Sequence, residues 1–161
     1  MFQILAHLGA RVATLGRVAV FAGFSLVALE ASASRAAQVD VHVTGVSNPR
    51  GHVRVELCTR QTFLTSSCPY TGAAPAMVGD TVVEISEVPP GEYAIQAFED
   101  DLDAGHVHQN LLGIPRERVG FSNDAPLHVQ GPIFSEAAFK VGEGAREVTL
   151  RLRKVLFGAK N

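Results

Sequence analysis

The sequence predicts an all-β domain, an antiparallel β-sandwich of about seven strands. Beyond the first 33 residues, several short segments alternate apolar and polar residues with a period of two. Segments rich in glycine and proline separate them, as turns separate short antiparallel strands. The same region contains no internal repeat and no long amphipathic helical pattern. A small closed barrel is the alternative arrangement of the same strands.

The first two predicted strands each place valines on one face. Residues 39–44 alternate three valines with polar residues, and residues 53–57 repeat the pattern. Glycine, asparagine and proline in residues 45–51 predict a turn, so we expect the two strands to form a hairpin. His42 and His52 fall on the polar faces and are expected to be exposed, with no functional role.

The middle of the chain predicts one connecting loop and two further strands. Residues 59–77 contain several small residues and prolines, which indicates a loop. Residues 81–88 are rich in β-branched side chains and predict a strand. Pro89-Pro90-Gly91 then predicts a tight turn. Residues 91–99 follow as a strand that is apolar on both faces, which is typical of a central strand.

A long polar segment precedes the last strands. Residues 100–131 are too long for a simple connection, and such loops are usually functional or contain local structure. Residues 133–139 predict one helical turn with Ser135 as its N-cap, followed by a return to strand. The clearest alternation of the chain lies in residues 147–153 and predicts the final strand.

The N-terminus has the pattern of a secretion signal. Arg11 and Arg17 precede an apolar run at residues 18–29, and a small-x-small cleavage pattern ends at Ala33. We therefore predict that residues 1–33 are a signal peptide and that the protein is exported to the periplasm or secreted. The apolar run is short for a membrane span. An uncleaved anchor helix is the alternative.

Composition limits what the rest of the chain can be. The chain has 161 residues, 47% hydrophobic and 19% charged, with a formal net charge of −2. These values fit one globular domain, which we place at residues 34–154, followed by a tail at residues 155–161. There is no tryptophan and no basic block in the body of the chain, so nucleic-acid binding is not expected. No membrane span is expected in the mature protein.

The chain has two cysteines, Cys58 and Cys68. In an exported protein the default expectation is a disulfide bond between them. Such a bond stabilises a small domain by about 2–4 kcal/mol. A catalytic thiol is the alternative, but the sequence indicates no base beside either cysteine.

A series of short motifs extends over residues 39–153. In chain order they are Pro89-Pro90-Gly91-x-Tyr93-Ala94, Asp100, Gly105, Asn110-x-x-Gly113-Ile114-Pro115, Glu117, Gly120-Phe121-Ser122-Asn123, Gly131-Pro132 and Phe134-x-x-Ala137-x-Phe139. This ordered series resembles the secreted bacterial family known as domain of unknown function twenty-one forty-one. The resemblance implies an exported β-sandwich of transthyretin-like or immunoglobulin-like fold, and it implies no activity.

The acidic start of the long loop is a weak candidate for a metal site. Family members often have a run of the form D-x-N-x-N-G-x-x-D, but Leu102 and Ala104 occupy ligand positions here and cannot bind calcium. An acidic turn whose carboxylates accept backbone N–H groups is the simpler interpretation. The weak candidates for a transition metal are Asp100, Asp103, His106 and His108, with His128 as a possible third imidazole.

The segment from Gly113 to Asn123 predicts a preorganised loop. Gly113 and Gly120 permit unusual φ angles, and Asn110 and Asn123 can satisfy backbone groups of the loop. Glu117 is expected to form surface pairs with its arginine neighbours in the sequence, Arg116 and Arg118.

The sequence predicts a non-enzymatic binding or envelope-accessory module that uses loop 100–123. No nucleophile–base pair or fixed pair of opposed carboxylates is identifiable, although Asp100 and Glu117 could face each other across the loop. The expected partner is an envelope protein or a small ligand, and no cofactor is predicted. A metal-binding protein that uses His106, His108 and nearby carboxylates is the alternative. The candidate binding residues are Asp100, Asp101, Asn110, Glu117, Ser122 and Asn123.

Overall fold

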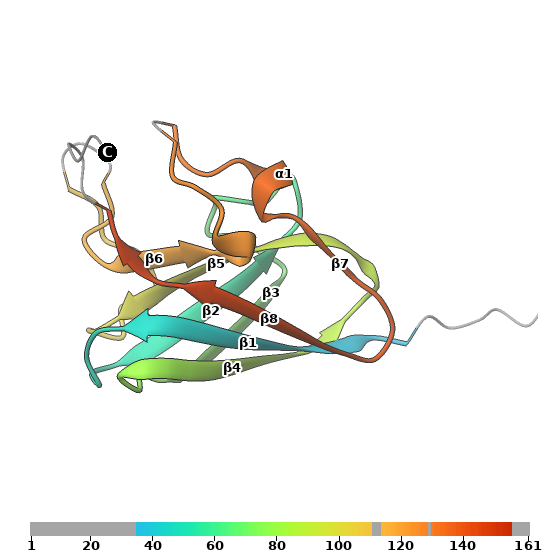
Figure 1. The fold of residues 1–161 in the computed structure, drawn as a ribbon, viewed down its shortest axis with the longest axis horizontal. Coiled ribbons are helices and arrows are strands. Elements are labelled where there is room, and N and C mark those ends of the chain that lie inside the picture. The colour runs from blue at the N-terminus through green and yellow to red at the C-terminus, as the bar shows by residue number, and fades with distance from the viewer. Residues whose placement is uncertain (1–34, 111–113, 129, 156–161) are drawn as a thin grey trace, which may run out of the picture. The chain divides into compact units, whose positions relative to one another are not determined.

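Two β-sheets form the domain (Figure 1). The computed structural model describes residues 35–110, 114–128 and 130–155, all of which belong to one unit, Ala33–Asn161. The predicted signal peptide, residues 1–33, and most of the tail lie outside the described residues. The strands are β1 (Ala37–Val46), β2 (His52–Cys58), β3 (Tyr70–Pro75), β4 (Gly79–Val88), β5 (Gly91–Asp100), β6 (Arg118–Phe121), β7 (Phe139–Val141), β8 (Ala145–Arg151) and β9 (Arg153–Lys154).

The smaller sheet has the order β4-β1-β8, and the larger has the order β3-β2-β5-β6-β9 with β7 paired to β5. All pairings are antiparallel except that of β1 with β8. The predicted all-β sandwich is therefore confirmed, and the strands form two sheets rather than one closed ring. The described residues form nine strands instead of about seven. Strands β3 and β6 were not predicted, and the predicted strand at residues 147–153 is divided into β8 and the two-residue β9.

The alternating valines fill the space between the sheets. Val39, Val41 and Val43 of β1 and Val53 and Val55 of β2 are fully buried. They belong to one apolar cluster with side chains of β4, β5, β7 and β8. Burying a valine side chain stabilises a fold by about 1.5–3 kcal/mol, so this cluster is the main source of stability.

The prediction that the first two strands form a hairpin was wrong. β1 pairs with β4 and β8, whereas β2 pairs with β3 and β5 in the other sheet. Alternation identifies the buried face of a strand but not its hydrogen-bonded neighbour. The predicted turn instead carries the chain from one sheet to the other. The carboxylate of Glu99 holds this crossing by accepting hydrogen bonds from the backbone N–H and the hydroxyl of Ser47.

A second correction concerns residues 59–77, which were predicted to be a loop throughout. Residues 70–75 form strand β3 at the edge of the larger sheet, paired with β2. Small side chains are poor strand formers, so the sequence did not indicate a strand. The structure explains the smallest of them, because a Cβ atom on Gly72 would lie 2.7 Å from the carbonyl oxygen of Glu84.

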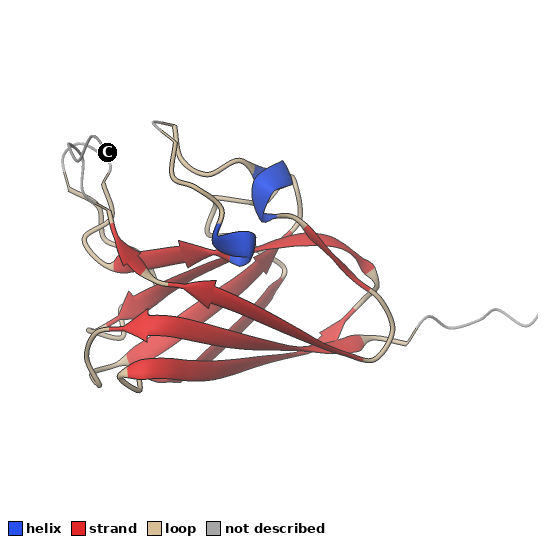
Figure 2. Cartoon of the chain, viewed as in Figure 1, coloured by secondary structure: helices blue, strands red, loops and turns tan. Residues whose placement is uncertain are grey.

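The long segment after β5 contains local structure. Residues 118–121 form strand β6 beside β5, and the 3-10 turn η1 (Ser122–Asp124) follows directly. The predicted helical turn is α1 (Phe134–Ala137), but its N-cap is Ile133, and Ser135 lies inside the helix. Figure 2 shows both helical elements on the same side of the strands. No helix in the described part of the chain is long and apolar enough to span a lipid bilayer.

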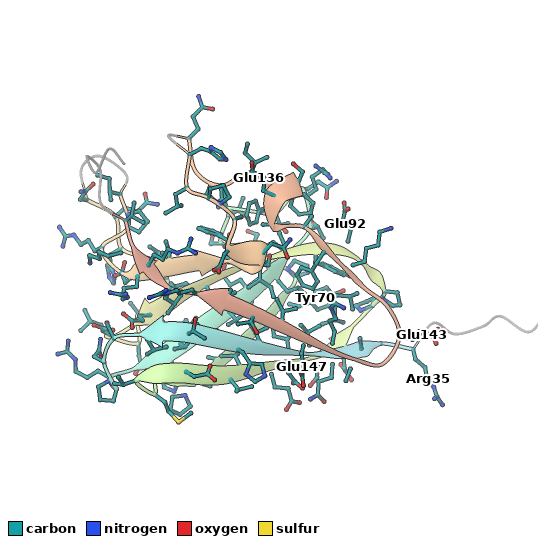
Figure 3. The ribbon with its side chains drawn as sticks, viewed as in Figure 1. Arg35, Tyr70, Glu92, Glu136, Glu143 and Glu147 are labelled. Atoms are coloured by element: carbon teal, nitrogen blue, oxygen red, sulfur yellow. A yellow bond between two sulfur atoms is a disulfide. The ribbon has the colours of Figure 1, made fainter. Side chains whose placement is uncertain are left out.

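The last predicted strand is confirmed in its pattern. Leu150 and Leu152 are buried, whereas Glu147 is exposed on the other side of β8 (Figure 3). Leu152 separates β8 from β9 and marks the point at which the chain passes from the smaller to the larger sheet. Its backbone N–H donates to the carbonyl oxygen of Thr44 at 2.9 Å.

A second apolar cluster covers the outer face of the larger sheet. Phe98 of β5 and Phe121 of β6 pack there with Phe134 of α1. Phe63, from the segment before β3, contacts Phe121 and Phe134 edge to face, with ring centroids 6.0 and 5.7 Å apart. Val155 at the start of the tail also packs against this cluster. Strand β5 is therefore apolar on both faces, as the sequence predicted.

The disulfide between Cys58 and Cys68 is present, with Cα atoms 4.6 Å apart. It closes the segment of residues 59–67 onto the end of β2. We expect replacement of both cysteines by alanine to lower the free energy of unfolding by about 2–4 kcal/mol, because the unfolded chain gains freedom. Urea denaturation of the variant and the oxidised protein measures the difference. An unchanged midpoint would contradict this account.

Ser122 is the polar link between β5, η1 and α1. It is fully buried, and its hydroxyl accepts a hydrogen bond from the N–H of Ile95 at 2.8 Å and donates to the carbonyl oxygen of Ala137 at 2.6 Å. Replacement by alanine leaves both backbone groups without this partner. We expect Ser122→Ala to lower the free energy of unfolding by about 1–3 kcal/mol in urea denaturation. Ser135→Ala, at an exposed position in α1, is the matched control and should change it by less than about 0.5 kcal/mol.

Candidate functional site

A crevice of about 400 Å³ opens on the outer face of the larger sheet. Its floor is apolar, from Phe98 of β5 and Val119 and Phe121 of β6. Its walls come from segments outside the sheet: residues 64–66, residues 105–107 with Gln109 and Pro115, and Leu127 with Gly131 and Pro132. No lysine or arginine of the described residues lines it. Because its lining is mainly apolar, we take this crevice as the candidate site.

The wall at residues 64–66 is held from below by one side chain. The Gln96 amide oxygen accepts the N–H of Leu64 at 2.9 Å, and its amide nitrogen donates to the carbonyl oxygen of Thr65 at 2.9 Å. The same nitrogen donates to the carboxylate of Glu56, the residue paired with Gln96 across β2 and β5. The disulfide closes the ends of this segment and Phe63 packs under it, so the wall is fixed at several points.

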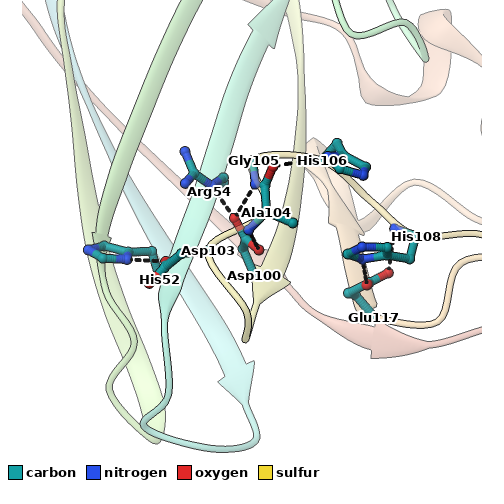
Figure 4. A network of polar contacts seen from close by, with 9 residues as sticks. All are labelled: His52, Arg54, Asp100, Asp103, Ala104, Gly105, His106, His108 and Glu117. Carbon is teal, nitrogen blue, oxygen red and sulfur yellow. Dashed lines mark hydrogen bonds and ion pairs between the residues drawn. The ribbon is translucent and has the colours of Figure 1, made fainter.

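The opposite wall begins at the end of β5, where Asp100 holds the chain reversal (Figure 4). Its side chain is 2% exposed and accepts hydrogen bonds from the N–H groups of Ala104 and Gly105, both at 2.8 Å. The Nε atom of Arg54 on β2 donates to the same carboxylate at 2.5 Å. The predicted acidic turn, in which a carboxylate accepts hydrogen bonds from backbone N–H groups, is thus present at Asp100, although this carboxylate is buried rather than solvated.

These contacts set the ionisation of Asp100. Burial by itself raises the pKa of the carboxyl group, but the N–H of Gly105, the Arg54 side chain and the N–H of Ala104 outweigh it. The pKa of Asp100 is therefore held below its ordinary value of 3.8. Because the charged form is favoured, the reversal that positions Gly105 and His106 is preorganised at neutral pH.

His106 lies on this wall, and the ring of His108 lies beside it, with ring centroids 4.8 Å apart. Nδ1 of His106 lies 3.0 Å from the carbonyl oxygen of Ala104; since a carbonyl only accepts, Nδ1 carries the proton and Nε2 is the acceptor of the neutral ring. His108 contacts Glu117 twice, through its backbone N–H at 3.0 Å and through Nδ1 at 2.7 Å. The prediction that Glu117 pairs with Arg116 or Arg118 was wrong, because its carboxylate contacts His108 instead.

The weak metal candidates do not converge in the described residues. Asp100 pairs with Arg54, and Asp103 pairs with His52 at 2.5 Å. His128 pairs with Glu136 at 2.8 Å. Within the described ranges, the one group of three potential ligand atoms comprises Glu56, Cys58 and Cys68, and its two sulfurs are joined in the disulfide. The structure therefore provides no support for the metal-binding alternative.

A second crevice, of about 590 Å³, is strongly charged and lies beyond the end of β5. It is lined by the carboxylates of Glu99, Asp100, Asp101 and Glu117 and by the cations of Arg50, Arg116, Arg118 and Lys154. Each carboxylate has its own partner: Ser47 for Glu99, Arg54 for Asp100, Asn48 for Asp101 and His108 for Glu117. The polar contacts that line this crevice mainly hold the ends of the strands and the adjoining loops together. The buried Nε atom of Arg118 has no hydrogen-bond partner among the described residues, but four nearby carboxylates oppose an anion there.

The predicted binding residues separate into three groups. Asp100, Asp101 and Glu117 line the charged crevice. Asn110 and Asn123 satisfy backbone groups, as predicted: Asn110 accepts the N–H of Ile114 at 3.0 Å, and Asn123 donates to the carbonyl oxygens of Glu136 and Ala138. The third group is Ser122 alone, which is fully buried and therefore lies outside any binding surface, contrary to the prediction.

Sequence reasoning missed the residues on the floor and near wall of the apolar crevice. The sequence could have indicated Glu56 and Gln96 as part of a site, because both fall on the outward faces of predicted strands. Phe98 lies on the same face as Gln96. A polar pair beside an outward phenylalanine indicates an outer face that is partly covered. Gly120 also has a different role from the predicted one: a Cβ atom there would lie 2.5 Å from the carbonyl oxygen of Arg151, so space rather than φ requires glycine. Gly113 lies outside the described residues.

Comparison with known families gives one match. A family model described as "Uncharacterized protein conserved in bacteria (DUF2141)" matches residues 41–149. This span begins in β1 and ends in β8, so it includes the whole apolar crevice. No curated protein matches the chain, and no solved structure does.

The depressed pKa of Asp100 predicts the direction of a pH effect. Its contribution to stability is complete above the unfolded pKa, near 3.8, and is lost as the pH falls through the lower folded pKa. We expect Asp100→Asn to lower the free energy of unfolding by roughly 1.5–3 kcal/mol at pH 7. The difference from the unsubstituted protein should shrink as the pH falls below about 4.

Urea denaturation at neutral and acidic pH measures this difference. Glu147→Gln, which removes an exposed carboxylate on β8, is the control and should change stability by less than about 0.5 kcal/mol at neutral pH. A difference between Asp100→Asn and the unsubstituted protein that grows on acidification would contradict the assignment.

Proposed function

The chain belongs to the bacterial family of uncharacterized proteins DUF2141, whose description names no activity, and we propose a function from the geometry of the apolar crevice. The protein is an exported, non-enzymatic module that binds a small ligand with an apolar body in this crevice. The predicted loop provides one wall of the site, through residues 105–107, and the disulfide-closed segment provides the other.

The observation that carries the proposal is the crevice itself. Its volume of about 400 Å³ falls within the range of small-molecule sites, and its lining is mostly apolar with a few polar groups. Its two principal walls are held before any ligand arrives, one by Gln96 and the disulfide, the other by Asp100. A preformed site reduces the entropy cost of binding, which supports a binding role.

Export is supported by the sequence and by one structural feature. The first 33 residues have the pattern of a signal peptide. The Cys58–Cys68 disulfide is the form expected of cysteines in an oxidising compartment. Both observations favour the periplasm or the extracellular space as the site of action.

A non-enzymatic role is supported by the contacts of the two candidate catalytic carboxylates. Asp100 and Glu117 line the same charged crevice, but Arg54 and two backbone N–H groups hold the first, and His108 holds the second. A general acid–base pair requires carboxyl groups that can exchange protons with a substrate. These two carboxylates instead have structural partners.

The test blocks the crevice without altering the sheet. Ser66 is exposed and lines the crevice, whereas the exposed neighbour Ser67 does not. We expect the neutral fluorophore N-phenyl-1-naphthylamine to bind the purified mature protein saturably, with increased emission. Ser66→Trp should weaken binding by about tenfold or more, since the indole occupies apolar space that otherwise receives the probe.

Ser67→Trp is the matched control and should leave the dissociation constant unchanged. Fluorescence titration of the three proteins measures the effect. Absence of saturable binding to the unsubstituted protein, or equal loss in both tryptophan variants, would exclude this crevice as the site.

A further inference from the structure

Glu56 places one carboxylate at the edge of the apolar crevice. It is half-buried, lines the crevice from β2, and accepts a hydrogen bond from the Gln96 amide. It forms no ion pair with any lysine, arginine or histidine in the described ranges. A carboxylate next to apolar side chains loses part of its hydration, and a cation is the partner that compensates this loss best.

Gln96 is neutral, and its amide group is already fully used in hydrogen bonds, so it cannot balance the negative charge of Glu56. Its oxygen accepts the N–H of Leu64, and its nitrogen is shared between the carbonyl oxygen of Thr65 and Glu56. These contacts fix the orientation of the amide, so its nitrogen faces the carboxylate. Glu56 is thereby held in place by a neutral donor, with its negative charge uncompensated by the described chain.

His106, on the opposite wall of the crevice, also favours a donor on the ligand. Nε2 of His106 is an acceptor in the neutral ring, because Nδ1 donates to the carbonyl oxygen of Ala104. The hydroxyl of Thr65 is already used within its own loop, through Thr62 and Ser67. The floor includes the rings of Phe98 and Phe121, and aromatic faces attract organic cations.

We propose that the crevice selects an organic monocation: a primary amine carried on an apolar, preferably aromatic, body, with its ammonium group at Glu56 and its body over Phe98 and Phe121. This inference rests on the proposed function of the crevice and adds the chemical class of its ligand. A hard metal ion fits poorly, because calcium and magnesium require several oxygen ligands and Glu56 is the one carboxylate that lines the crevice among the described residues. A carboxylate ligand is disfavoured by repulsion from Glu56.

The test compares three indoles that share a ring and differ in charge. Tryptamine is the cation, 3-methylindole is neutral and indole-3-propionate is the anion at pH 7. Isothermal titration calorimetry of the mature protein is expected to give about tenfold tighter binding of tryptamine than of 3-methylindole, and weaker binding of indole-3-propionate.

Substitution of Glu56 isolates the charge. Glu56→Gln retains an oxygen that can accept the hydrogen bond of Gln96, and it should reduce tryptamine binding to the level of 3-methylindole. Binding of 3-methylindole itself should change by less than about twofold, which also shows that the site is folded. Glu92→Gln is the matched control: Glu92 is an exposed residue of β5 outside the crevice, and its loss changes the net charge equally.

The outcomes separate the inference from the proposed function. If all three indoles bind equally and Ser66→Trp blocks them, the crevice binds ligands but does not select cations. If Glu56→Gln and Glu92→Gln weaken tryptamine equally, the effect is one of net charge and the inference is wrong. If no indole binds the unsubstituted protein, the inference fails, and the neutral-fluorophore titration decides separately whether the crevice binds ligands at all. Should Glu56→Gln not fold, the comparison of the three indoles on the unsubstituted protein decides the inference.

Discussion

The central constraint on this fold is that strand β5 must bury both of its faces. Tyr93, Ile95 and Ala97 pack between the two sheets, and Ala94 and Phe98 pack on the other side. A two-layer sandwich covers one face of each sheet, so the second face of β5 requires a further layer. The segment before β3, the polar loop, η1 and α1 form that layer. They cover the face incompletely, and the uncovered part is the apolar crevice.

Polar groups on and beside β5 connect this outer layer to the sheet. Gln96 holds one loop, Asp100 holds another, and Ser122 joins η1 and α1 to the N–H of Ile95. Each of these side chains forms hydrogen bonds with backbone groups, and Gln96 and Asp100 also contact the side chains of Glu56 and Arg54, so these polar groups are satisfied. The site is therefore positioned by the same strand that organises the core, and its walls inherit the rigidity of the sheet.

The sequence indicated the fold class, most strands and the disulfide, because alternation and cysteine count depend on local pattern. The sequence did not indicate which strands pair with each other. β1 and β2 have the alternating pattern expected of a hairpin, yet they lie in opposite sheets. β3 was missed because it is rich in small residues, which are poor strand formers, and at Gly72 the close approach of β4 requires glycine in a way that local propensity does not express. For the site, the loop was identified, but Glu56 and Gln96 were not, since their importance depends on which strands pair.

The Cys58–Cys68 bond has a consequence for when the site exists. The crevice wall at residues 64–66 lies inside the ten-residue interval that the bond spans. In a reducing environment the two ends of this interval are tied only by non-covalent contacts, and the wall has more freedom to open. Under the proposed function, oxidation therefore acts as a step of maturation. A newly made chain would complete its ligand site at the stage at which its thiols are oxidised, so the proposed export and the proposed binding competence would be acquired together.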